Sequence, residues 1–292
     1  MDKSFVRPEL IVETDWLAHH LGDPDVRVID ATTHLMPATG KPYDIVSGRA
    51  DFEKAHIPGA GFIDIDEDIS DASQHPLHFM LPSNEHFAAA MRAQGIGEST
   101  LVVCYSSANH WWATRLWWML RVYGHDRAAV LNGGFQKWQR EQWPIESGPQ
   151  RAATPATSFK AHKRSEMVAA KADVLAAIGA GDTCTLNALR PEQHAGTGGS
   201  VYGRPGHITG SVNVAALNMV DADNTFKPAA ELAELMRPAL DKPHVITYCG
   251  GGIAATSTTL ILTMLGHDSV RVYDASLTEW APDATLPMQT GP

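Results

Sequence analysis

At 292 residues the chain is too long for one typical domain of about 150 residues and long enough for two, each with its own core. The sequence contains no run of 18 apolar residues and no apolar leader, which excludes a membrane protein and predicts a cytoplasmic one. A formal net charge of −10 leaves no excess of Lys and Arg to neutralise phosphates, so we expect no nucleic-acid partner.

In chain order, short β-branched segments alternate with helical stretches. The first half has apolar segments at 26–31 and 101–105, which are typical of buried strands, followed by a helical stretch at 114–123. The second half repeats this alternation, with strands expected at 184–186 and 245–248 and a helix at 254–265. Strands joined by helices favour parallel βαβ units. We therefore predict an α/β fold in which each half is a parallel sheet flanked by helices.

Three segments of the first half recur in the second half, in the same order and 142 to 151 residues later. They are HIPGA at 56–60 with HITGS at 207–211, GHD at 124–126 with 266–268, and VLNGGFQKW at 130–138 with VYDASLTEW at 272–280. Ordered matches at nearly constant spacing indicate a duplicated domain.

Residues 143–157 (WPIESGPQRAATPAT) separate the two repeats. They are rich in Pro, Ala, Ser and Thr and lack apolar periodicity, as linkers do. We place the first domain at 1–145, the linker at 146–157 and the second domain at 158–292.

The two repeats differ most in the loop after their central strand. Alignment places the loop 106–112 (SSANHWW) against the loop 249–255 (CGGGIAA), and only the second contains a thiol there. The carboxyl end of a parallel strand is where α/β folds bind ligands. Glycines let successive N–H groups converge on an anion, and the following helix adds its positive end. The candidate anion-binding residues are Gly250, Gly251, Gly252, Ile253, Ala254 and Ala255.

Cys249 is the candidate nucleophile of this loop, because such amides stabilise a thiolate. The alternative is an inert, buried cysteine in a tight turn. The repeat comparison favours the nucleophile, since the first loop already makes the turn without three consecutive glycines. Cys104 and Cys184 lie in or beside apolar strands and are expected to be inert. Three dispersed cysteines cannot form a disulfide framework or a four-thiolate zinc site, and we expect no metal and no cofactor.

The HIPGA and HITGS segments, the two GHD elements, the VLNGGFQKW pair and the Cys249 loop together resemble the rhodanese family, over nearly the whole chain. The resemblance is to its two-domain thiosulfate and mercaptopyruvate sulfurtransferases. It implies two tandem rhodanese-like domains, of which the first is inactive and the second catalytic. It also implies that a sulfane sulfur passes from a small anionic donor to a Cys249 persulfide and then to a thiol or cyanide. A thiol redox protein is a further candidate partner.

The residues that would bind the donor depart from the family pattern. Thiosulfate-preferring members have cationic residues directly after the cysteine, and mercaptopyruvate-preferring members usually have Gly-Ser-Gly, so the three glycines at 250–252 lie nearer the second group. Leu189 and Gln193 occupy the positions of two donor-binding arginines. Arg190, one residue out of register, and Arg204 are the candidate substitutes.

His56, in HIPGA, is a third donor-binding candidate, although a structural role shared with His207 is favoured.

Two other functions compete with sulfur transfer. Cysteine-dependent phosphatases, some of which have a rhodanese-like fold, need an arginine six residues after the cysteine, and this chain has Ala255 there. A non-catalytic sulfur carrier, which receives persulfide from a partner protein, is the more serious alternative, because the donor-binding arginines are missing.

Overall fold

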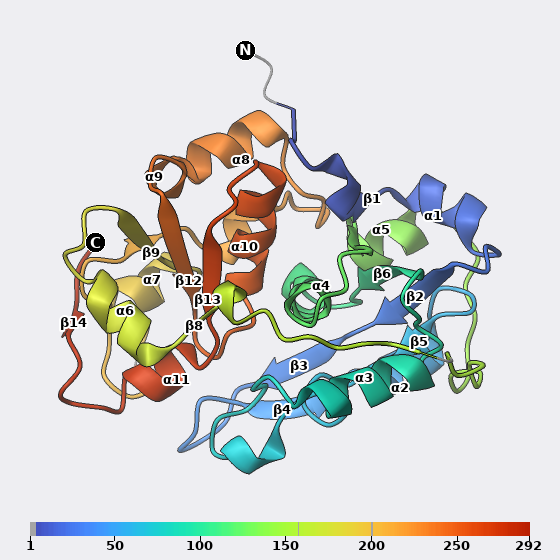
Figure 1. Ribbon diagram of the computed structural model, residues 1–292, viewed down its shortest axis with the longest axis horizontal. Coiled ribbons are helices and arrows are strands. Elements are labelled where there is room, and N and C mark those ends of the chain that lie inside the picture. The colour runs from blue at the N-terminus through green and yellow to red at the C-terminus, as the bar shows by residue number, and fades with distance from the viewer. Residues whose placement is uncertain (1–3, 157, 200) are drawn as a thin grey trace.

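The computed structural model describes residues 4–156, 158–199 and 201–292, and within them it contains two five-stranded parallel sheets (Figure 1). The N-terminal sheet has the strand order β1-β7-β6-β2-β5, and the C-terminal sheet has the order β8-β13-β12-β9-β11. Each strand of one sheet therefore has a counterpart in the other, which confirms the duplication predicted from the sequence. The N-terminal strands are β1 (Ile11–Val12), β2 (Val26–Asp30), β5 (Gly61–Phe62), β6 (Leu101–Tyr105) and β7 (Ala128–Leu131); the C-terminal strands are β8 (Val168–Ala169), β9 (Thr183–Asn187), β11 (Val212–Asn213), β12 (His244–Tyr248) and β13 (Val270–Tyr273).

Helices cover both faces of each sheet, because the central strands β2, β6, β9 and β12 are buried on both sides. The outer faces pack against α1, α2 and α5 in the first half and α6 and α11 in the second. The inner faces pack against α3 and α4, and against α8, α9 and α10. The helices are α1 (Thr14–His20), α2 (Arg49–Lys54), α3 (Asn84–Ala93), α4 (His110–Val122), α5 (Gly134–Arg140), α6 (Lys171–Ala177), α7 (Pro191–Ala195), α8 (Ala229–Leu235), α9 (Arg237–Leu240), α10 (Ala255–Met264) and α11 (Ser276–Trp280).

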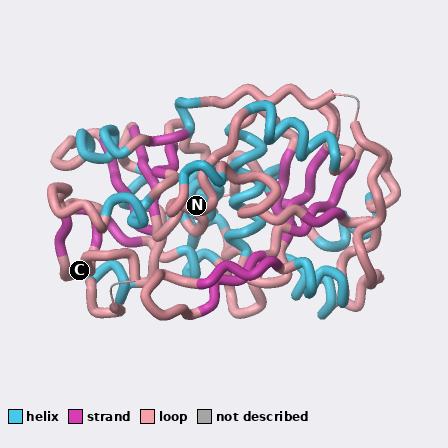
Figure 2. Tube along the Cα trace, turned by 90° about the horizontal axis from the view of Figure 1, so that it is seen from below, coloured by secondary structure: helices cyan, strands magenta, loops and turns pink. Residues whose placement is uncertain are grey.

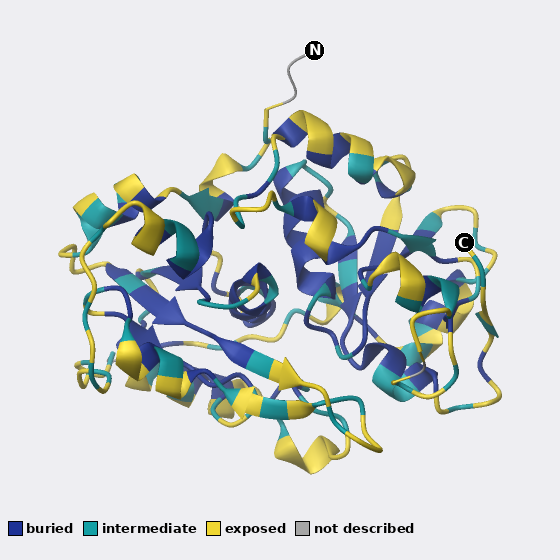
Figure 3. Cartoon of the chain, turned by 180° about the vertical axis from the view of Figure 1, so that it is seen from behind, coloured by how far each residue is buried: buried dark blue, intermediate teal, exposed yellow. Residues whose placement is uncertain are grey.

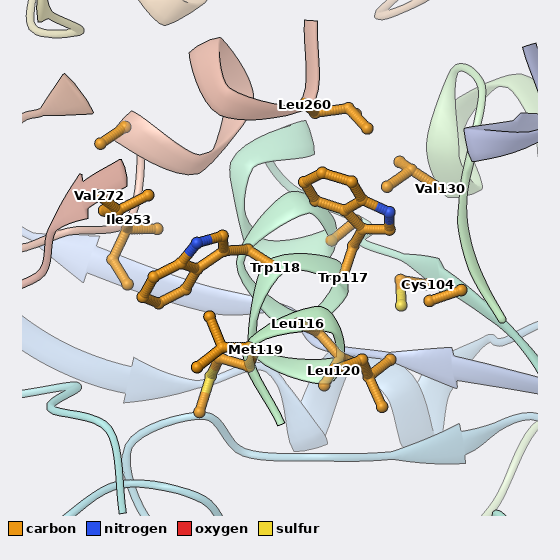
Figure 4. Close-up of a cluster of buried hydrophobic side chains, with 14 of the residues drawn as sticks. Cys104, Leu116, Trp117, Trp118, Met119, Leu120, Val130, Ile253, Leu260 and Val272 are labelled. Carbon is orange, nitrogen blue, oxygen red and sulfur yellow. The ribbon is translucent and has the colours of Figure 1, made fainter. Parts of the chain in front are cut away.

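The two halves share one hydrophobic core, which is formed between α4 and α10. Both helices are almost entirely buried (Figure 3). Trp117 and Trp118 of α4 lie below Leu260 of α10 in the close-up of this cluster (Figure 4). Between the helices, the Thr114 hydroxyl is 2.8 Å from that of Thr256. The sheets stand on either side of the central helices (Figure 2).

Two antiparallel ribbons complete the fold. The ribbon β3 (Thr33–Met36) with β4 (Asp44–Ser47) belongs to the first half, and β10 (His207–Ile208) pairs with β14 (Met288–Gln289) in the second. Four short 3-10 helices are also described, η1 (Pro8–Leu10), η2 (Ala72–Gln74), η3 (Ser165–Met167) and η4 (Ala216–Met219).

The elements expected from the sequence are confirmed, with small shifts at their ends. The helix expected at 114–123 is α4, which begins four residues earlier, and the helix expected at 254–265 is α10. The predicted linker, 146–157, lies in the segment between α5 and η3, whose described part forms no helix. Residues 1–3 of the predicted first domain, residue 157 of the linker and residue 200 of the second domain lie outside the described residues. No described helix is both long and apolar enough to cross a bilayer.

Candidate active site

Cys249 directly follows β12, the middle strand of the C-terminal sheet. Its carbonyl oxygen accepts a hydrogen bond from the amide of Leu277 at 3.2 Å, and α10 begins six residues later at Ala255. The predicted position at the carboxyl end of a parallel strand and before a helix is therefore the observed one. Such a position brings a side chain to the crevice in which α/β folds bind ligands.

A cavity of about 700 Å³ opens over Cys249, and both domains contribute to its wall. The residue itself is only 2% exposed, so its access to solvent is through this cavity. The first half contributes residues from the β3–β4 ribbon and from the start of α4, and the second half contributes the segments around the Cys249 loop. The wall includes Leu35, Met36, Pro37, Tyr43, Trp111, Leu189, Arg190, Glu192, Val201, Tyr202, Leu217, Cys249, Gly250, Gly251, Ile253 and Ala254.

Most amides of the Cys249 loop have no acceptor within the described residues. The amides of Cys249 and Gly252 donate to the hydroxyl oxygen of Ser276 at 3.0 and 3.1 Å. The amides of the other predicted anion-binding residues make no hydrogen bond to the described part of the chain; these residues are Gly250, Gly251, Ile253, Ala254 and Ala255. Unpaired N–H groups around a buried thiol are costly unless an anion or water accepts from them. The loop is therefore suited to hold a negatively charged sulfur.

Glycine is required at position 252, and at position 250 it allows the close approach of Tyr202. Gly252 has φ +75°, and a Cβ atom there would lie 2.3 Å from the carbonyl oxygen of Asp274. A Cβ atom on Gly250 would lie 2.1 Å from both Cζ and the hydroxyl oxygen of Tyr202. No side chain fits at either position without a shift of the neighbours, so the glycines bring the loop backbone close to groups of the cavity wall.

A buried ion pair holds the loop from the other domain, and the sequence did not reveal it. Arg115, on α4, is fully buried and donates to Asp274 at 2.6 Å and to the carbonyl oxygen of Gly252 at 3.2 Å. It also donates to the carbonyl oxygen of Phe79. The signal in the sequence was one arginine inside the apolar stretch 114–120 (TRLWWML), because a buried charge needs a partner. That the partner is Asp274 could be seen only in the folded structure.

Ser276 is strained, and its counterpart in the first repeat is a glycine. Ser276 has φ +51° and Gly134 has φ +56°. A non-glycine residue in this region costs conformational energy, and such strain often marks functional sites. The serine hydroxyl compensates by accepting the two loop amides and donating to the carbonyl oxygen of Tyr273 at 2.8 Å.

The structure separates the three donor-binding candidates. Arg190 lines the cavity, and no ion pair is formed by it within the described residues. Arg204 does not line the cavity, because its guanidinium donates to four carbonyl oxygens between Trp280 and Leu286. His56 is buried outside the cavity, where Nδ1 is 2.7 Å from the carbonyl oxygen of Phe52. Its geometry fits the structural role that the sequence favoured.

Cys104 and Cys184 do not line the cavity. Burial raises the pKa of the Cys104 thiol strongly and raises the pKa of Cys184 to about 11. Cys104 lies in the shared core near Trp117 and Val130 (Figure 4). Both thiols remain protonated at neutral pH and are poor nucleophiles.

Comparisons with known proteins agree with this geometry. The model of the rhodanese-like domain matches residues 13–141 and again 173–283. The 3-mercaptopyruvate sulfurtransferase of Escherichia coli K12 is 35% identical over 289 residues, which cover 95% of this chain and 97% of the relative. The thiosulfate sulfurtransferase of Rattus norvegicus is 33% identical over 282 residues, covering 92% of this chain and 91% of the relative.

Two solved structures are also similar. The 3-mercaptopyruvate sulfurtransferase SseA from Escherichia coli superimposes with a TM-score of 0.77 at 33% identity, covering 91% of this chain and 98% of its own. An anaerobic ergothioneine biosynthesis enzyme from Chlorobium limicola superimposes with a TM-score of 0.83 at 20% identity, covering 99% of this chain and 72% of its own. The second likeness concerns the fold alone. Matches over nearly the whole length to enzymes do not favour a non-catalytic carrier.

Proposed function

Because this chain belongs to the rhodanese family and is a sulfurtransferase, we propose that Cys249 is the residue that carries the sulfur. The observation that supports this assignment is the set of amides without an acceptor in the loop that begins at Cys249 and lines the cavity. Of the three cysteines, Cys249 alone lines that cavity. Cys104 and Cys184 are buried away from the cavity and do not lie in a loop of amides without acceptors.

The proposed reaction has two steps. The Cys249 thiolate attacks the outer sulfur of the donor, and the bond between that sulfur and the rest of the donor breaks. The leaving group, sulfite from thiosulfate or the enolate of pyruvate from mercaptopyruvate, takes the electron pair. An acceptor thiolate or cyanide then attacks the terminal sulfur of the Cys249 persulfide, and the cysteine leaves as a thiolate. The loop amides stabilise the anionic sulfur in both steps, and ping-pong kinetics follow.

The donor is proposed to be a small anion, as the names of the relatives suggest. Arg190 is the cationic side chain of the described cavity wall, which also includes the acidic Glu192. A wall with one positive and one negative side chain is better suited to a singly charged carboxylate than to the doubly charged thiosulfate. We therefore expect mercaptopyruvate to be the preferred donor and Arg190 to bind its carboxylate.

The first domain, at 1–145, is proposed to have no sulfur site of its own and to close the cavity of the catalytic domain at 158–292. A thiol redox protein is a candidate acceptor, because Leu35 and Met36 of the cavity wall are 38% and 49% exposed and offer an apolar contact beside the site. A cytoplasmic location belongs to the same proposal, since all three cysteines are free and the mechanism needs a reduced thiol.

The mass of the intact protein tests the role of Cys249. Incubation with mercaptopyruvate should add one sulfur atom, about 32 Da, to the wild type and to the matched control Cys184→Ser, and nothing to Cys249→Ser. A gain by Cys249→Ser, or no gain by the wild type with either mercaptopyruvate or thiosulfate, would contradict the proposal.

A further inference from the structure

Two tyrosines from opposite domains line the cavity next to the Cys249 loop. Tyr43 lies just before β4 in the first half, and Tyr202 lies between α7 and β10 in the second. Both line the cavity together with Cys249.

The two phenol groups lie directly over the glycines that follow the cysteine. The close approach of Tyr202 to Gly250, described above, places its hydroxyl 2.1 Å from where a Cβ atom would stand. The Tyr43 hydroxyl lies 3.2 Å from the corresponding point on Gly251. Both hydroxyl groups are therefore within a few ångströms of the backbone that surrounds the reactive sulfur.

These two hydroxyls have no hydrogen-bond partner within the described residues, and in this they differ from the four other tyrosines of the chain. The partners of the others are the Ile57 amide for Tyr105, the Pro82 carbonyl for Tyr123, Ser211 for Tyr248 and Glu279 for Tyr273. The four paired tyrosines are buried, whereas Tyr43 and Tyr202 are half-buried and line the cavity. Their hydroxyls are therefore free to donate to a molecule bound there.

Both phenols stay protonated. Burial raises the pKa of Tyr43 and of Tyr202 well above the usual value, and the negative charge of Cys249 raises both further. A neutral phenol next to a thiolate is a hydrogen-bond donor and not a base.

We propose that Tyr43 and Tyr202 are catalytic residues that donate hydrogen bonds to the donor oxygen on which negative charge collects as the sulfur leaves. The inference rests on the proposed role of Cys249. As the thiolate attacks mercaptopyruvate, the carbon–sulfur bond breaks and its electron pair spreads from carbon to the carbonyl oxygen of the enolate. The phenols stabilise that oxygen and keep their protons, and water later protonates the enolate carbon. The two domains thus form one oxyanion site, in a cavity with a single lining arginine.

Phenylalanine substitutions test this role, because they remove the hydroxyl and keep the ring that packs on the loop. The variants are Tyr43→Phe, Tyr202→Phe and the double variant, and Tyr273→Phe, which loses a hydrogen bond to Glu279 away from the cavity, is the control. Single-turnover persulfide formation is measured against mercaptopyruvate concentration. We expect the saturating rate constant to fall about 10- to 100-fold in each single variant, with the half-saturating concentration changed by less than about threefold. The control should stay within about twofold of the wild type.

A donor without oxygen separates this role from a structural one. Inorganic polysulfide leaves its negative charge on sulfur, so the phenylalanine variants should take up its sulfur at about the wild-type rate, within about twofold. Wild-type rates with mercaptopyruvate, a change confined to its half-saturating concentration, or equal losses with both donors would overturn the inference. A wild type that takes up sulfur from neither donor would instead overturn the role of Cys249, and the oxyanion site with it.

Discussion

The loops 106–112 and 249–255 have the same place in the two repeats and differ in what their amides contact. Each begins with a carbonyl oxygen, of Ser106 or Cys249, that accepts a hydrogen bond at 3.2 Å from an amide of the helix after the next strand, α5 or α11. In the first loop, the amide of Ser107 donates to the Thr32 hydroxyl at 2.8 Å, and that of Ala108 donates to the Ser106 hydroxyl at 3.0 Å. In the second loop the corresponding amides, of Gly250 and Gly251, have no acceptor within the described residues. Within a common fold, therefore, side chains that occupy or release the loop amides distinguish a structural turn from a reactive one.

The largest expected effect comes from moving the thiol to the first loop. The variant Ser106→Cys in a Cys249→Ser background should gain no sulfur from mercaptopyruvate by intact mass, because the Thr32 hydroxyl still occupies the amide at 107 and position 106 does not line the cavity. If a thiol at 106 became persulfidated, the occupied amides would not explain the difference between the loops.

Breaking the interdomain ion pair should have the next largest effect. The counterpart of Asp274 in the first repeat is the uncharged Asn132, so the first repeat has no ion pair at this position. Arg115→Met leaves Asp274 buried without its cationic partner and should lower the free energy of unfolding by about 3–5 kcal/mol in urea titrations. The exposed pair Arg140–Asp223 supplies the control, since Arg140→Met should cost less than about 1 kcal/mol. Equal costs of the two variants would show that the pair does not hold the loop.

A smaller effect is expected when Ser276 is made like its counterpart, Gly134. Ser276→Gly removes the strain at φ +51° but leaves the amides of Cys249 and Gly252 without their acceptor. We expect the persulfidation rate to fall about tenfold through a less well-held loop. The free energy of unfolding should change by less than about 1 kcal/mol, because the two effects oppose each other. An unchanged rate would mean that the hydroxyl is not needed to position the loop.

The smallest effect concerns the buried Asp30, which corresponds to the uncharged Asn187 in the second repeat. Asp30 pairs with Tyr105 as Asn187 pairs with Tyr248. Burial raises the pKa of Asp30 from 3.8 to about 6. The folded protein holds this proton more tightly than the unfolded chain, so the stability falls as the pH rises from 3.8 to about 6.

Asp30→Asn removes this dependence. It should raise the free energy of unfolding by about 1 kcal/mol at about pH 7.5 and change it little at about pH 4.5, in urea titrations at both pH values. The same gain at both pH values would contradict the titration of Asp30 as its cause.

The fold and the position of Cys249 could be predicted because both are encoded locally or by repetition. Short apolar segments predicted the strands, and the three repeated segments predicted the duplication. Three glycines after a thiol predicted the anion-binding loop at 249–255. Local patterns of this kind depend on neighbours along the chain, which a single sequence displays.

The surroundings of Cys249 could not be predicted, because they depend on contacts between distant segments. Arg115 meets Asp274 across 159 positions. Tyr202 lies against Gly250 only because the segment after α7 folds back over the loop. Arg190 and Arg204 looked alike in the sequence, and only the structure shows that carbonyl oxygens surround the second.

Locating the added sulfur within the chain tests the central claim most directly. After a single turnover with mercaptopyruvate, peptide mass spectrometry should find the extra sulfur on the peptide that contains Cys249 and none on those containing Cys104 or Cys184. Sulfur on either of these two cysteines, or spread over all three, would show that the amides of the 249–255 loop do not determine which thiol reacts.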